Sequence, residues 1–137
     1  MQSIGSENTN LIYLSVILIT GGTDRKSAEI YNPATKASCS LPLFSEVRVG
    51  HSQNGGLTCG GGVDGSSALK TCVRWNSTSG TWDQFDWELK EPRISHVSWA
   101  TASGVYLIGG GSSPKTSEKV TKDGSEFSFD MKYDKQR

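Results

Sequence analysis

Short apolar stretches alternate with polar loops along this chain, and the stretches recur. An apolar run that ends in a glycine pair occurs three times, as VILITGG at 16–22, GLTCGG at 56–61 and GVYLIGG at 104–110. Each run is too short for a typical helix and is closed by residues that favour turns, so each predicts a β-strand. A polar loop and another strand-like stretch follow each glycine pair, which predicts three similar hairpins.

Further landmarks keep the same order and nearly the same spacing. Arg-x-x-His occurs twice, as Arg48 to His51 and Arg93 to His96, and the two histidines are 45 residues apart. Two other landmarks occur three times each, at spacings of 43 to 45 residues: Tyr31, Trp75 and Val120, and then Cys39, Trp82 and Phe127. An internal repeat with a period of about 45 residues explains all of them.

Each repeat reads as four short strands. In the second repeat the strands are expected at 51–54, 57–61, 71–76 and 81–87, separated by turns rich in Gly, Asn and Ser. A four-stranded unit with this period is typical of a propeller blade. The sequence therefore predicts an all-β chain of about three four-stranded antiparallel blades, at about 10–47, 48–92 and 93–134, and a polar tail at 135–137.

These landmarks resemble the kelch repeat family. That family has a glycine pair after an apolar strand, an aromatic residue on the next strand, a Trp on the fourth, and Arg-x-x-His before the following blade. The resemblance covers roughly residues 16–133 and implies a partial β-propeller with structural roles for the matching residues. These are Gly21, Gly22, Tyr31, Arg48, His51, Gly60, Gly61, Trp75, Trp82, Arg93, His96, Gly109 and Gly110.

Three blades are fewer than the four to eight of a closed propeller. We interpret the chain as a fragment of a longer propeller. Two alternatives stay open: two chains that together build a six-bladed ring, or a different fold. Uncovered blade faces would expose apolar surface, so self-association through these faces is expected.

Charge and hydropathy exclude two classes of partner. The 137 residues include 14 basic and 14 acidic side chains, interspersed along the chain, so we expect no nucleic-acid partner. The longest apolar run, LIYLSVILI at 11–19, is too short to span a bilayer, so no membrane insertion is expected. Since this run lacks the flanks of an export signal, we interpret it as a buried strand.

The candidate chemistry is sparse. The two histidines occupy equivalent repeat positions, the cysteines lack metal-site spacing, and neither a phosphate-binding loop nor a nucleophile elbow occurs. We therefore expect no enzyme activity, no metal and no cofactor. The resemblance leaves two alternatives: part of a secreted enzyme like galactose oxidase, with its catalytic residues outside this chain, or a substrate adapter.

A binding module remains the favoured function. The loops at 23–27, 63–70 and 112–117 differ in length and sequence while the strands repeat, as expected if loops recognise a protein or glycan ligand. Cys59 and Cys72 fall on neighbouring strands and are a candidate disulfide, and Asn76-Ser77-Thr78 is a candidate glycosylation site. Extracellular and cytoplasmic locations both stay open.

Overall fold

The computed structural model describes residues 4–5, 13–14, 16–21, 26–63, 65–111 and 113–132, and confirms the all-β prediction. Besides strands, the described residues contain one 3₁₀ turn, η1 (Gly65–Ser67). The strands are β1 (Ile4–Gly5), β2 (Tyr13–Leu14), β3 (Ile17–Thr20), β4 (Ala28–Asn32), β5 (Ala37–Ser40), β6 (Ser52–Asn54), β7 (Leu57–Cys59), β8 (Cys72–Asn76), β9 (Thr81–Gln84), β10 (Val97–Thr101), β11 (Gly104–Ile108), β12 (Thr116–Thr121) and β13 (Gly124–Asp130).

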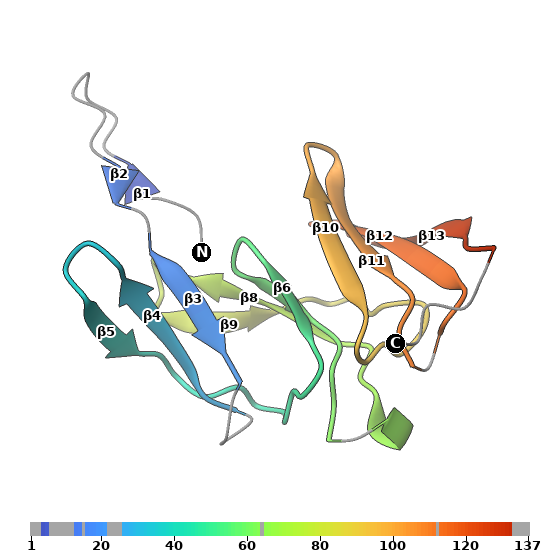
Figure 1. Ribbon diagram of the computed structural model, residues 1–137, viewed down its shortest axis with the longest axis horizontal. Helices are drawn as coiled ribbons and strands as arrows, with labels where there is room; N and C mark the ends of the chain where they lie inside the picture. The colour runs from blue at the N-terminus through green and yellow to red at the C-terminus, as the bar shows by residue number, and fades with distance from the viewer. Residues whose placement is uncertain are drawn as a thin grey trace.

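Three antiparallel sheets follow one another along the chain and stand side by side in that order (Figure 1). The first sheet has the order β3-β4-β5, the second β6-β7-β8-β9 and the third β10-β11-β12-β13, while β1 and β2 pair separately. Strands that are neighbours in a sheet are also neighbours in sequence, so each sheet is a simple meander. In the second sheet each strand starts within one residue of its predicted start.

The first sheet departs from the predicted four strands. Strand β3 leads into a glycine pair, as β7 and β11 do, but β7 and β11 are the second strands of their sheets whereas β3 is an edge strand. Among the described residues before it, β1 and β2 pair with each other instead. The first sheet therefore has three described strands. Gly22, which completes the first glycine pair, and the tail at 135–137 lie outside the described residues.

The sequence predicts a buried strand at 11–19. In the part of this strand that the structure describes next to the first glycine pair, only one face is buried. In β3, Leu18 is buried, whereas Ile17 and Ile19 on the opposite face are exposed. The reason is the position of the sheet: the second sheet covers one of its faces, and no described strand covers the other (Figure 1).

The contact between the first and second sheets, here called the first seam, is aromatic. Phe44, from the segment that links the two sheets, is buried, and its ring lies 4.5 Å from that of Trp82. Trp82 in turn lies 5.3 Å from Trp75, its register partner on β8. Aromatic rings at these separations contribute both buried area and favourable ring contacts.

The contact between the second and third sheets, the second seam, is aliphatic and holds the main core cluster. Its members come from both sheets and from the segment between them: Leu57, Cys59, Cys72, Leu89, Leu107 and Val120. Burial of each large aliphatic side chain contributes about 1.5–3 kcal/mol. These side chains therefore hold the two sheets face to face.

Candidate functional site

The two repeated arginines are buried in the seams and bind backbone carbonyls. Arg48 lies in the segment that links the first sheet to the second. At the second sheet its Nη1 donates to the carbonyls of Gly60 (2.7 Å) and Thr71 (3.0 Å). Its Nη2 donates to the Thr71 hydroxyl (2.7 Å) and to Glu46 (3.2 Å). The Thr71 carbonyl also accepts from the amide of Gly60 (3.0 Å), so the guanidinium is its second partner and adds a donor for the Gly60 carbonyl where strand pairing ends.

Arg93 repeats this arrangement 45 residues later. Its Nη1 donates to the carbonyls of Gly109 (2.9 Å) and Thr116 (3.0 Å), and its Nη2 to the Thr116 hydroxyl (2.9 Å). Unlike Arg48, it also donates from Nε, to the fully buried carboxylate of Glu118 (2.8 Å). Both guanidinium groups are committed to the fold and are poor candidates for binding a ligand.

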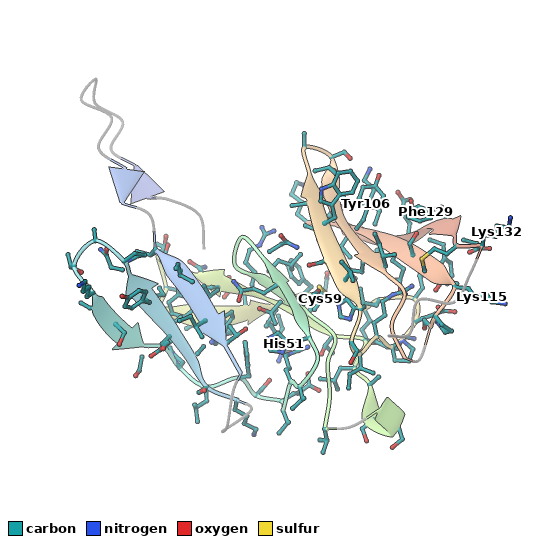
Figure 2. The ribbon with its side chains drawn as sticks, in the orientation of Figure 1. His51, Cys59, Tyr106, Lys115, Phe129 and Lys132 are labelled. Carbon is teal, nitrogen blue, oxygen red and sulfur yellow. A yellow bond between two sulfur atoms is a disulfide. The ribbon has the colours of Figure 1, made fainter. Side chains whose placement is uncertain are left out.

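The two histidines lie between sheets, each beside an arginine (Figure 2 labels His51). His51 Nδ1 donates to the carbonyl of Arg48 (2.9 Å), and its Nε2 lies 2.7 Å from the hydroxyl of Thr20 on the first sheet. His96 Nε2 lies 2.7 Å from the hydroxyl of Ser52 on the second sheet. Each histidine therefore ties a linking segment back to the sheet that precedes it.

Burial keeps both imidazoles neutral. It is the main reason that the pKa of His96 is lowered to about 4, and the charge of Arg93 acts in the same direction. Burial also lowers the pKa of His51 below its ordinary value. His96 Nδ1 is buried and has no hydrogen-bond partner. Within the described part of the chain, no three His, Cys, Asp or Glu side chains are grouped so as to hold a metal ion.

A disulfide joins Cys59 and Cys72, which are register partners on β7 and β8 with a Cα–Cα distance of 4.2 Å. Both cysteines are buried in the second seam. The third cysteine, Cys39 on β5, is exposed and unpaired. The bond therefore clamps the loop between β7 and β8 at its base.

Asn76 has a turn-forming role that is independent of glycosylation. Its Oδ1 accepts hydrogen bonds from the amides of Thr78 (3.0 Å) and Ser79 (3.2 Å), which closes the turn between β8 and β9. Asn32 forms the same turn in the first sheet with the amides of Ala34 and Thr35. Ser77 and Thr78 of the sequon are exposed, whereas Asn76 is half-buried and its Nδ2 donates to Asp83 Oδ2 (2.9 Å).

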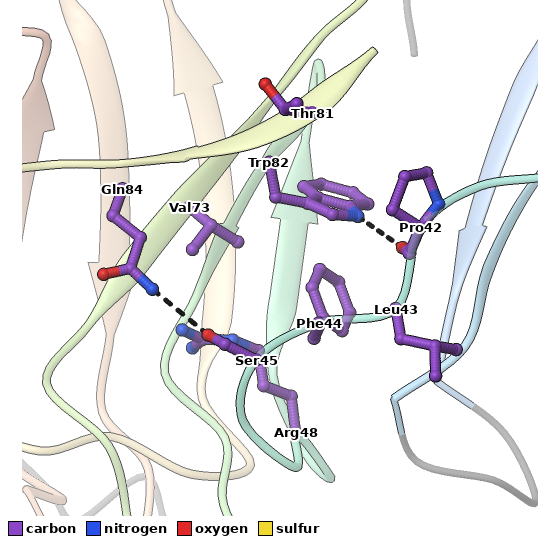
Figure 3. A pocket seen from close by; sticks show the side chains of 9 residues that line it. All are labelled: Pro42, Leu43, Phe44, Ser45, Arg48, Val73, Thr81, Trp82 and Gln84. Carbon is purple, nitrogen blue, oxygen red and sulfur yellow. Dashed lines mark hydrogen bonds between the residues drawn. The ribbon is translucent and has the colours of Figure 1, made fainter.

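A cavity of about 170 Å³ opens at the first seam (Figure 3). Trp82 Nε1 donates across it to the carbonyl of Pro42 (2.8 Å), and Gln84 Nε2 to the hydroxyl of Ser45 (3.1 Å). Ligand pockets are usually about 300–1,000 Å³. This space is therefore a packing gap beside the linking segment rather than a ligand site.

The connections that follow the glycine pairs, from β3 to β4, from β7 to β8 and from β11 to β12, are each closed by an equivalent hydrogen bond. The amide of Gly21 donates to the carbonyl of Ser27 (2.8 Å), Gly60 to Thr71 (3.0 Å) and Gly109 to Thr116 (3.0 Å). The second connection is the longest and contains η1, with Val63, Ser66 and Ser67 exposed. Parts of these loops, including 22–25, Asp64 and Ser112, lie outside the described residues.

Sequence reasoning missed three groups that complete the arginine sites. Thr71 and Thr116 are 45 residues apart, as are Glu46 and Glu91, so a residue-by-residue search at the repeat period would have found them. Glu118 has no such signal, since Val73 stands at the equivalent position of the second sheet.

No known protein family and no curated protein matches the chain. Among the described residues, no helix is long and apolar enough to cross a bilayer.

Proposed function

We propose that the three sheets are blades of a kelch-type β-propeller and that the chain is a non-catalytic binding module for a protein or glycan. In this proposal the second-to-third-strand connections recognise the ligand and the seams hold these connections in place. The proposal rests on one observation: the hydrogen bonds at the base of the three loops repeat, whereas the loops themselves do not. The closing hydrogen bonds from Gly21, Gly60 and Gly109 are equivalent, while the loops above them differ in length and sequence.

The connection at 61–70 is the best candidate for the main contact. It is closed at its base by the Cys59–Cys72 disulfide and by the hydrogen bond between Leu69 N and Gly61 O (2.7 Å). A loop that is fixed at its base loses less conformational entropy when it binds. Exposed hydroxyls at Ser66 and Ser67, beside the exposed Val63, suit a surface with mixed polar and apolar character.

The disulfide also bears on the cellular compartment in which the protein works. Disulfides persist in the secretory pathway and outside the cell and are rare in the reducing cytosol. We therefore propose that the module works in an oxidising compartment, where a glycan or the ectodomain of another protein is an accessible ligand.

The test compares two variants of the full chain on an immobilised glycan panel and an extracellular-protein panel. The loop variant combines Val63→Asp with Ser67→Lys. The matched control combines Ser77→Lys with Lys122→Asp, at exposed turns between third and fourth strands, and leaves Asn76 and Thr78 of the candidate sequon in place. The proposal expects at least one panel member to bind the parent chain and the control alike and to lose about tenfold or more affinity for the loop variant. Equal binding of all three chains, or no binding on either panel, contradicts it.

A further inference from the structure

The third sheet presents an exposed aromatic face, opposite to the face in the second seam (Figure 2 labels Tyr106 and Phe129). Trp99, Tyr106 and Phe129 form a row across the sheet, with successive ring centroids 6.4 Å and 6.5 Å apart. Trp99 is 64% exposed. A hollow of about 470 Å³ lies over the row and also borders Ile108. We call this surface the C-terminal face.

The C-terminal face occupies the position of a buried surface in the other two sheets. Tyr106 stands three residues before the glycine pair of its sheet, as Leu18 and Leu57 do in theirs. Leu18 and Leu57 are each only 4% exposed, because the next sheet covers them. The third sheet has the same kind of surface, and no sheet formed by the described residues lies upon it.

The first sheet has the complementary surface, here called the N-terminal face, formed by Ile17, Ile19, Glu29 and Tyr31. Register pairs Ile17 with Tyr31 and Ile19 with Glu29, so these side chains share one face. Ile19 is 43% exposed, whereas Thr58 and Leu107, at the same position before the glycine pair, are 0% and 1% exposed. In the second and third sheets, the preceding sheet covers this surface.

From these two uncovered faces we infer that two copies of this chain bind head to tail. The C-terminal face of each copy is then covered by the N-terminal face of the other. The occupant is a second copy because its first sheet offers the apolar surface that repeats the covering side of a seam. Two such contacts related by a two-fold axis close a ring of six sheets, and a ring of that size lies within the range of propellers. The inference rests on the proposed propeller fold and does not depend on ligand binding by the loops.

The test is the mass of the purified full chain by light scattering, with folding of each variant checked by circular dichroism. The parent chain is expected at twice its 14.8 kDa mass. Trp99→Glu and Ile19→Glu each place a charge on one face only, and each is expected to give a monomer. Val63→Glu, at an exposed apolar residue outside both faces, is the control and is expected to stay dimeric.

A mixture of the Trp99→Glu and Ile19→Glu variants tests directly whether the two faces bind each other. Each of these two variants keeps one intact face, so an equimolar mixture is expected to form one-to-one complexes joined by a single contact. A parent chain that is a monomer overturns the inference, as do open-ended assemblies that grow with concentration. A dimer that is lost in Trp99→Glu and kept in Ile19→Glu also overturns it, because that pattern indicates a contact between two C-terminal faces. If Ile19→Glu or Trp99→Glu does not fold, Ile17→Glu and Phe129→Glu replace them.

Discussion

Arg93 and Glu118 form a fully buried ion pair, with 2.8 Å between Nε and Oε2 and no solvent exposure of either side chain. The arginine belongs to the segment that leaves the second sheet, and the carboxylate to β12 of the third sheet. Glu118 also accepts hydrogen bonds from the amides of Lys90 and Glu91 and from the hydroxyl of Ser125. One carboxylate therefore fastens the linking segment to the third sheet.

Glu118→Gln is expected to lower the free energy of unfolding by about 3–5 kcal/mol, because it removes the buried counter-charge of Arg93 and leaves only the half-buried carboxylate of Glu91, 3.7 Å from Nη2. Glu126→Gln is the matched control, since Glu126 is exposed on the neighbouring strand, and it should change stability by less than about 0.5 kcal/mol. Urea denaturation followed by tryptophan fluorescence measures both. Equal effects of the two substitutions would show that the ion pair contributes nothing.

Gly60→Ala is expected to be far more damaging than Gly80→Ala, although both glycines have positive φ, at +67° and +71°. A Cβ at Gly60 would lie 2.4 Å from the carbonyl oxygen of Arg93 and 2.9 Å from His96 Cε1, whereas a Cβ at Gly80 meets nothing within 4 Å. The Gly80 variant should lose about 1–2 kcal/mol from backbone strain alone. The Gly60 variant should lose at least a further 1–3 kcal/mol from crowding at the second seam, measured by thermal unfolding.

Stability is expected to fall as the pH drops below about 6.5. The pKa of His96 is about 4 in the folded chain and 6.5 when unperturbed, so between these values the unfolded chain binds a proton that the folded chain does not. The stability contributed by neutral His96 is complete above pH 6.5 and lost toward pH 4, by about 3 kcal/mol in total. The lowered pKa of His51 acts in the same direction.

Denaturant titrations between pH 4.5 and 7.5 measure this dependence. In His96→Gln the slope of stability against pH should be clearly shallower, because the imidazole whose pKa is lowered to about 4 is gone. An unchanged slope in that variant would assign the pH dependence to other groups.

The cysteines are expected to differ in reactivity. In the folded, unreduced chain a thiol reagent should label one cysteine, Cys39, which is exposed and unpaired. After reduction in denaturant it should label all three cysteines. Replacing both Cys59 and Cys72 by Ala should cost about 2–4 kcal/mol of stability. Labelling of more than one thiol before reduction, measured by mass spectrometry, would contradict the pairing.

The repeat was readable in the sequence because it combines local signals. Glycine pairs after apolar runs, and turns of Gly, Asn and Ser at regular spacing, reflect backbone constraints within a few residues of each other. These signals placed the strands of the second sheet to within one residue at their starts. They also placed Cys59 and Cys72 on neighbouring strands, whereas the register that pairs the two cysteines across the β7–β8 connection came from the structure.

Other features depended on contacts between distant segments. Nothing near Glu118 in the sequence indicates a buried carboxylate, because its partner Arg93 comes from another sheet. The exposure of Ile17 and Ile19 likewise could not be predicted from the sequence, since an apolar strand has the same sequence pattern whether one or both of its faces are covered. The separate pairing of β1 with β2, which leaves the first sheet with three described strands, also required the tertiary structure.

The sequence by itself determined that the chain is all-β and that its strands recur with a period of about 45 residues, because alternation, turn chemistry and glycine pairs act locally. The tertiary structure decided which side of each sheet is covered, how Arg48 and Arg93 fasten successive sheets, and which two faces stay open. Those features depend on packing between segments far apart in the chain, and side-chain burial across a seam has no signature within a single strand.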